Sequence, residues 1–194
     1  MSVSQELDRL ERHPHVVRLR RSLAEHPPVV VEPEPHMRLA AILRAARDTR
    51  IHALVTWAAI STVKRWPTDI AADWRKRGWL DVENARTKQL FRLRTPVLDE
   101  ATEHGDGMLD VARAAETLLC PWLIVHGDAD ETVLVGEAES LAASAGRNAE
   151  LLRIAGATHT FNVAHGMTSP SPQLGEATDR TVRFFVDRLL APAR

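Results

Sequence analysis

The chain has 194 residues, of which 44% are hydrophobic, enough apolar material for one domain with a buried core. Its 25 Lys and Arg residues nearly balance its 26 Asp and Glu residues, so the formal net charge is −1. A charge this close to zero gives no electrostatic reason to expect binding to nucleic acid or to an anionic membrane surface.

The single cysteine, Cys120, excludes an internal disulfide framework and a cysteine-based zinc cluster. We expect a buried structural thiol, because Cys120 comes directly before an apolar run. No apolar stretch approaches the roughly 20 residues that span a bilayer, and the start of the chain contains no apolar signal-peptide core. These features predict a soluble protein of the cytoplasm.

The first part of the chain predicts a polar segment followed by a βαβ unit. Residues 1–28 are polar and rich in Arg and His. Three consecutive valines at 29–31 favour a short strand. Residues 37–47 are good helix formers, and 51–57 has the composition of a strand. We therefore expect two parallel strands joined through a helix.

The middle of the chain, 62–118, is dense in mixed charges and holds three of the five tryptophans, Trp66, Trp74 and Trp79. It predicts helices and connectors without strands, ending in a short helix at 111–119. The tryptophans could line a pocket or form the core of this insertion.

The last part of the chain alternates strands with helices. The expected elements are a strand at 122–126, a helix at 135–145, a strand at 150–154 and a helix at 177–190. This order predicts an α/β fold with a mostly parallel sheet of about four strands. The sheet would have an unpaired edge at 29–31 or 51–57, which a second copy of the chain could cover, giving a homo-oligomer.

Polar residues follow two of the predicted strands. Asp128 and Asp130 come after the strand at 122–126, and His159 comes after the strand at 150–154. One helix and one strand separate Asp130 from His159, so the two strand ends should lie side by side. A carboxylate that holds a histidine lets the histidine act as a general base, although ordinary loop residues would give the same spacing.

Two segments resemble motifs of the α/β-hydrolase superfamily, in particular its dienelactone-hydrolase and prolyl-oligopeptidase-like branch. HGDADETV at 126–133 resembles the HGxxDxxV motif, and GATHTF at 156–161 resembles the segment that carries the catalytic histidine. The resemblance covers roughly residues 37–190.

The resemblance implies a partial α/β-hydrolase fold over 29–194, with a helical cap inserted at about 62–118. It implies that Asp130 is the acid and His159 the base of a Ser-Asp-His triad, with Asp128 in a supporting role. Substrates would then be small esters, lactones or peptides. We expect no metal site, because the sequence has no H-E-x-x-H or paired His spacing, and no cofactor, since it has no phosphate-binding glycine loop.

The chain departs from the family at the nucleophile, which stands on a G-x-S-x-G turn before a helix. The corresponding place reads Glu-Pro-Glu-Pro-His at 32–36, with no Ser, Cys or Thr between Ser22 and Thr49 and no glycine before Gly78. The oxyanion-hole segment and about a hundred residues of the family's N-terminal half have no counterpart either. A truncated or frame-shifted hydrolase would also explain this beginning.

We therefore expect weak or no hydrolase activity, and the sequence leaves open whether the chain is an enzyme. The alternative is a non-catalytic remnant that binds a small acyl ligand or a partner chain. Ser61 follows the strand at 51–57 and could be a displaced nucleophile, but it lacks flanking glycines and more simply caps the next segment.

Overall fold

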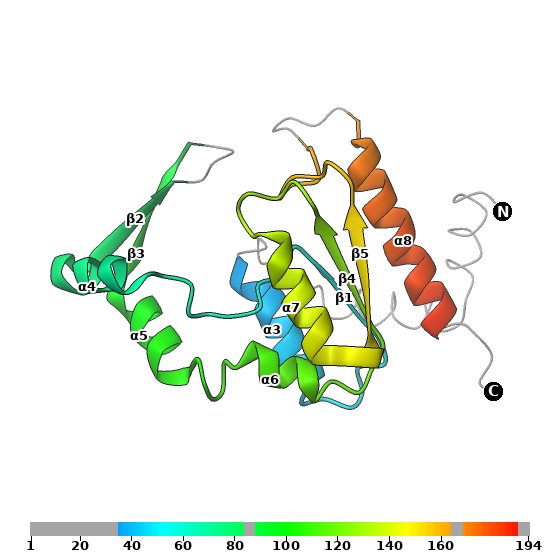
Figure 1. The fold of residues 1–194 in the computed structure, drawn as a ribbon, viewed down its shortest axis with the longest axis horizontal. Coiled ribbons are helices and arrows are strands. Elements are labelled where there is room, and N and C mark those ends of the chain that lie inside the picture. Colours follow the sequence, from blue (N-terminus) through cyan, green and yellow to red (C-terminus); the bar gives the residue numbers. More distant parts are fainter. Residues whose placement is uncertain (1–34, 84–87, 164–168, 190–194) are drawn as a thin grey trace, which may run out of the picture. The chain divides into compact units, whose positions relative to one another are not determined.

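The computed structural model describes residues 35–83, 88–163 and 169–189 (Figure 1). The strand expected at 29–31, the βαβ unit that it would begin and the polar segment at 1–28 lie outside the described residues.

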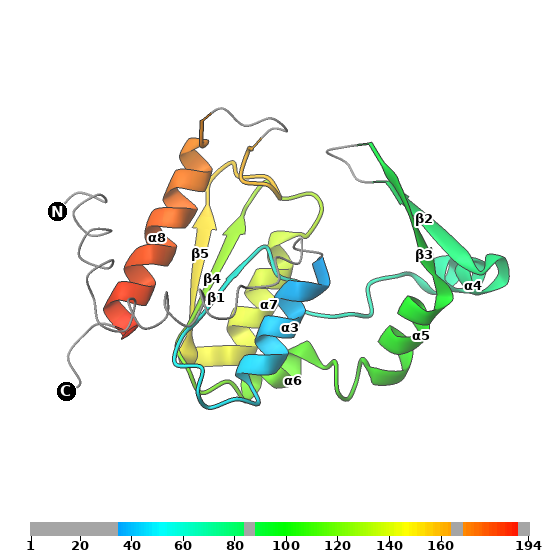
Figure 2. The same cartoon turned by 180° about the vertical axis from the view of Figure 1, so that it is seen from behind.

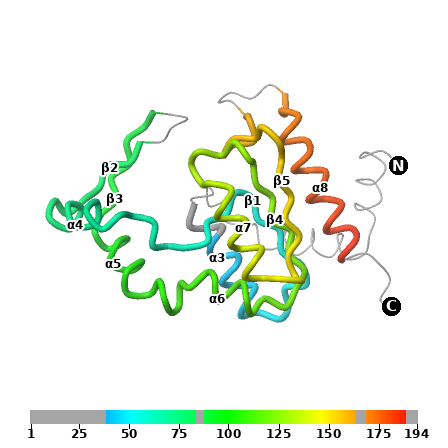
Figure 3. Tube along the Cα trace, in the orientation of Figure 1, coloured from blue at the N-terminus to red at the C-terminus, as the bar shows by residue number. Residues whose placement is uncertain are grey.

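The path of the chain can be followed in Figure 3. Its helices are α3 (Pro35–Ala45), α4 (Thr68–Arg77), α5 (Thr95–His104), α6 (Val111–Glu116), α7 (Val135–Ala145), the short 3₁₀ turn η1 (Gly146–Asn148) and α8 (Pro172–Leu189), and its strands are β1 (Leu54–Trp57), β2 (Trp79–Glu83), β3 (Leu90–Arg94), β4 (Trp122–Gly127) and β5 (Ala149–Ile154).

The main sheet has three parallel strands in the order β1-β4-β5 within the described residues. All six residues of the central strand β4 are buried, as its continuous apolar run predicts for a strand covered on both faces. The indole N–H of Trp122 donates to the hydroxyl of Thr56 at 3.0 Å and joins β4 to β1 in the interior. The α/β class and the parallel sheet are confirmed.

Helices cover both faces of this sheet (Figures 1 and 2). Trp122 and Ile124 of β4 point to one side and pack with residues of α3, α6 and α7. Leu123 and Val125 point to the other side and pack with α8. The alternation of side chains along a strand produces this division.

The prediction that 62–118 contains no strand is wrong. β2 and β3 form an antiparallel pair, in which Leu80 lies opposite Leu93 and Val82 opposite Phe91. Gly78 ends α4 with a φ of 84°, which glycine adopts without the steric cost of a Cβ, and turns the chain directly into β2. The cap is therefore helical and β-stranded.

The tryptophans of the cap divide between its core and its surface. Trp74 is fully buried, packs edge-to-face with the half-buried Trp66, and donates its indole N–H to the carbonyl of Leu93 at 3.1 Å. Trp79 is 37% exposed, and the Arg92 guanidinium lies over its ring. Trp66 and Trp74 thus belong to the core of the cap, one of the two roles considered for them.

In the described part of the chain, β1 has a strand partner on one edge only, β4. The homo-oligomer in which a second copy of the chain covers the other edge of β1 stays a prediction. Among the described residues, no helix is long and apolar enough to cross a membrane.

Candidate functional site

Asp130 lies in the turn that follows β4, and backbone N–H groups hold its carboxylate in place. Its Oδ1 accepts the N–H groups of Thr132 and Val133, both at 2.9 Å. The side chain is buried, with only 3% of the residue exposed. Asp130 therefore presents its second oxygen, Oδ2, in one fixed direction.

His159 lies in the loop that follows β5, and its ring meets this second oxygen. The Nδ1 of His159 is 2.8 Å from Oδ2 of Asp130. The register of the sheet explains the meeting, because Gly127 at the end of β4 lies opposite Ile154 at the end of β5. The structure brings together the two predicted site residues, which lie 29 positions apart in the sequence.

The pKa of Asp130 reflects two opposing effects. Burial disfavours the charged carboxylate and by itself would raise the pKa. The hydrogen bond with His159 and those from the N–H groups of Val133 and Thr132 outweigh burial, so the pKa of Asp130 lies below its ordinary value. The carboxylate is therefore charged at neutral pH. It accepts the Nδ1 proton of His159 and directs the basic lone pair of the neutral ring to Nε2.

Two further contacts bind the acid turn to the histidine loop. The N–H of Gly156 donates to Oδ1 of Asp128 at 2.7 Å, and the N–H of Ala129 donates to the carbonyl of Ala157 at 3.1 Å. The side chain of Asp128 thereby joins the acid turn to the histidine loop. The supporting role that the resemblance implies for Asp128 stays a prediction.

His126 is a part of this site that sequence reasoning missed. It is fully buried at the end of β4, its Nε2 is 2.7 Å from the carbonyl of Val133, and the same nitrogen is 3.5 Å from Oδ2 of Asp130. Its Nδ1 has no hydrogen-bond partner within the described structure. The sequence signal for His126 was its position at the start of the HGDADETV motif, four residues before Asp130.

Ser61 makes its hydrogen bonds with Glu137 of α7. Its N–H and its hydroxyl both donate to the same oxygen of Glu137, each at 2.6 Å. Arg65 approaches the other oxygen of that carboxylate at 3.9 Å. The hydroxyl of Ser61 therefore fixes the start of the cap connection against α7, which agrees with the structural role weighed against a displaced nucleophile.

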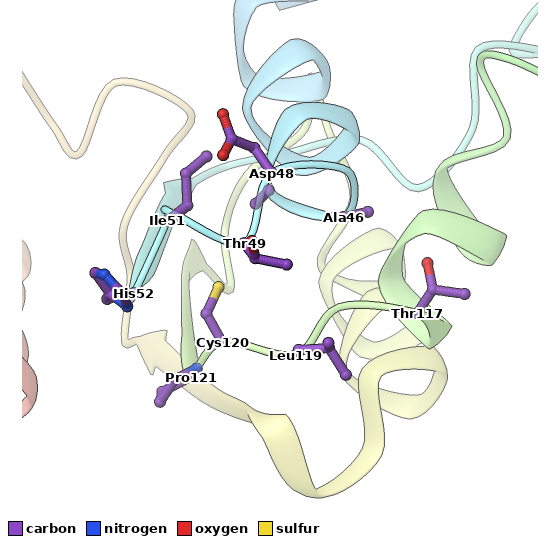
Figure 4. Close-up of a pocket in the computed structure, with 10 residues that line it drawn as sticks. Ala46, Asp48, Thr49, Ile51, His52, Thr117, Leu119, Cys120 and Pro121 are labelled. Atoms are coloured by element: carbon purple, nitrogen blue, oxygen red, sulfur yellow. The ribbon is translucent and has the colours of Figure 1, made fainter.

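A cavity of about 370 Å³ lies at the amino-terminal ends of strands β1 and β4 (Figure 4). Its walls come from residues 45–52 and 117–121, which precede β1 and β4, and they include Cys120. Asp130 and His159 follow strands β4 and β5, at the opposite ends of the parallel strands. The cavity therefore does not serve the acid–histidine pair. No cluster of three or more potential metal-binding side chains occurs in the described portions.

Comparison with known proteins gives structural likeness only. No family model matches the sequence, and a search of curated proteins finds no significant match. An esterase domain from Rhodothermus marinus is 13% identical with a TM-score of 0.52, over 76% of this chain and 56% of that one. Est1E from Butyrivibrio proteoclasticus is 20% identical with a TM-score of 0.54, over 79% and 58%.

Mouse alpha/beta hydrolase domain-containing protein 10 is 17% identical with a TM-score of 0.58, over 88% of this chain and 68% of the mouse chain. At these identities the likeness shows a shared fold. The chain spans only 56% and 58% of the lengths of the two bacterial proteins.

Proposed function

We propose that this chain, which has the α/β-hydrolase fold, carries the acid and the base of a serine-hydrolase relay, Asp130 and His159. One observation carries the proposal: Nδ1 of His159 lies 2.8 Å from a buried carboxylate oxygen of Asp130, whose other oxygen is held by two backbone N–H groups. A carboxylate so fixed orients the imidazole and stabilises the imidazolium that forms when the ring takes a proton.

The chemistry that this pair supports is acyl transfer. His159 would take the proton of an attacking hydroxyl at Nε2 and later deliver it to the leaving group. Small esters, lactones and peptides all react this way, and the names of the neighbours, an esterase domain and a hydrolase domain protein, are in keeping with this class.

We further propose that the chain as written hydrolyses such substrates weakly or not at all. Its sequence contains no G-x-S-x-G segment to place a nucleophile before α3. Ser61, the serine that follows β1, donates a hydrogen bond from its hydroxyl to Glu137.

Hydrolysis of p-nitrophenyl acetate by the wild type, His159→Ala and His52→Ala tests the expected weak turnover, and it also tests the relay if turnover is strong. His52 serves as the matched control. It is an exposed histidine before β1, at the ends of the strands opposite to His159. We expect little hydrolysis by any of the three. Strong activity that only His159→Ala loses would support the relay and contradict the expectation of weak turnover. Strong activity that survives in His159→Ala would contradict the relay itself.

A second candidate is a non-catalytic protein that binds a partner chain through its cap. Four large apolar side chains of the β2–β3 hairpin are exposed: Trp79, Val82, Leu90 and Phe91. A fluorophosphonate probe separates the two candidates, because covalent labelling of any serine requires an activated hydroxyl. Labelling favours the hydrolase, whereas binding of a ligand or partner without labelling favours the binding protein.

A further inference from the structure

We propose that Asn162 is a positioning residue that holds the loop carrying His159, an inference that rests on the proposed function of the acid–histidine pair. Asn162 follows His159 by three residues and has an exposed side chain. Its amide nevertheless turns back along the loop and contacts residues on the other side of the histidine.

Three hydrogen bonds join Asn162 to the residues before His159. The side-chain Oδ1 accepts the N–H of Thr158 at 2.9 Å, and Nδ2 donates to the carbonyl of Gly156 at 3.0 Å. The backbone N–H of Asn162 donates to the hydroxyl of Thr158 at 3.2 Å. Because Thr158 directly precedes His159, these bonds close the loop around the histidine.

The backbone of the loop explains why an asparagine stands here. Phe161 and Asn162 have φ angles of 53° and 60°, in the left-handed region that residues other than glycine seldom adopt. Asparagine tolerates this region better than most side chains because it can hydrogen-bond locally. The two hydrogen bonds of its amide therefore offset part of the conformational cost of the left-handed backbone at Phe161 and Asn162.

The ends of the loop are anchored independently, so the amide of Asn162 acts on the part between them. At one end, the N–H of Gly156 binds Asp128 at 2.7 Å. At the other end, Phe161 is buried edge-to-face against Trp57, and the hydroxyl of Ser171 donates to its carbonyl. Without the amide, residues 157–160 would keep their fixed ends and lose the bonds that set the direction of the His159 ring.

Proton NMR of ¹⁵N-histidine-labelled protein can test this assignment. The measured signal is the Nδ1 proton of His159, which a hydrogen bond to a carboxylate shifts far downfield and protects from exchange. The test variant is Asn162→Gly, which keeps the left-handed backbone accessible and removes both amide bonds. The control is Asn148→Ala, because Asn148 donates its amide to the carbonyl of Leu118 away from the site.

We expect the wild type and Asn148→Ala to show the downfield proton and Asn162→Gly to lose it. The indole N–H signal of Trp122, which is buried in the sheet, should remain in all three and report an intact fold. A downfield proton that persists unchanged in Asn162→Gly overturns the role of Asn162 while leaving the pair intact. Its absence from the wild type overturns the pair, and with it this assignment.

Asn162→Asp gives a milder second test if Asn162→Gly does not fold. Aspartate keeps an oxygen that can accept the N–H of Thr158 and removes the Nδ2 donor to the carbonyl of Gly156. We expect the His159 Nδ1 proton to exchange with water several-fold faster than in the wild type. An unchanged exchange rate contradicts the proposal.

Discussion

Gly127 passes so close to Ala157 that a Cβ on this glycine would lie 2.1 Å from the Ala157 carbonyl oxygen. Gly127 ends β4 and leads into the acid turn, while Ala157 belongs to the histidine loop. The missing side chain is therefore what allows the two loops to approach until Asp130 and His159 meet.

Replacing Gly127 by alanine should force these loops apart. The added methyl would meet main-chain atoms of Ala157, which cannot move aside like the end of a flexible side chain. We expect a loss of about 1–3 kcal/mol in the free energy of unfolding, measured by urea titration. Gly175→Ala is the matched control, because a Cβ at Gly175 in α8 meets open space. It should stabilise the protein by about 0.5–1 kcal/mol, and equal effects of the two substitutions would contradict the steric argument.

Protonation of Asp130 should weaken the fold in acid. Because the pKa of Asp130 is lowered in the native state, its stabilising contribution is fully present above the unfolded value of about 4 and is lost as the pH falls through the native pKa. Asp130→Asn should lower the free energy of unfolding at pH 7 by about 1.5–3 kcal/mol, the contribution of hydrogen bonds to a buried charged group.

The same variant should also depend less on pH in this acidic range than the wild type. Urea titrations at pH 7 and at several pH values below 4 measure both effects. Asp179→Asn replaces an exposed carboxylate of α8 and should behave like the wild type. A parallel pH dependence of Asp130→Asn and the wild type would rule out Asp130 as the titrating group.

Cys120 should react slowly with thiol reagents in the native protein. The residue is only 8% exposed, and burial raises the pKa of its thiol above the ordinary value. Its sulfur nevertheless borders the cavity at the amino ends of the strands, so reagent can approach from that side (Figure 4). We expect iodoacetamide to modify the native protein at pH 7.5 at least tenfold more slowly than the urea-unfolded chain, because the thiolate is the reactive form. Equal rates would contradict both the burial of the thiol and its raised pKa.

Local sequence patterns predicted the described strands of the main sheet because each is a short run rich in apolar and β-branched residues. The run predicted as a strand at 122–126 is the buried central strand β4, and the spacing from Asp130 to His159 fits one helix and one strand between neighbouring strand ends. The resemblance of the two motifs added their proposed roles, which the geometry alone does not assign.

The hairpin of the cap could not be read in the same way. Charged and apolar residues mix on β2 and β3, and most of both strands is exposed. The pair is held together by contacts between elements: Leu80 and Leu93 pack against Trp74 of α4, and Arg92 of β3 forms an ion pair with Asp81 of β2 at 2.8 Å. The close passage at Gly127 is likewise a tertiary relationship without a local signature.

His126 should stabilise the acid turn through Val133. The Nε2 of His126 is 2.7 Å from the carbonyl of Val133, whose own N–H is bound by Asp130. His126→Phe keeps a planar ring of similar size but leaves that buried carbonyl without its donor. We expect a loss of about 1–3 kcal/mol in the free energy of unfolding, whereas the exposed His52→Phe should change little.

The two side chains that meet at Val133 should also be energetically coupled. If His126 and Asp130 hold the same turn, the cost of His126→Phe should shrink in an Asp130→Asn background, where the turn is already loosened. Urea titrations of both single variants and the double variant measure this coupling, which we expect to be about 0.5–3 kcal/mol. Additive effects would mean that His126 contributes only to the packing at the end of β4, because a side chain that merely fills space has no reason to sense the charge of Asp130.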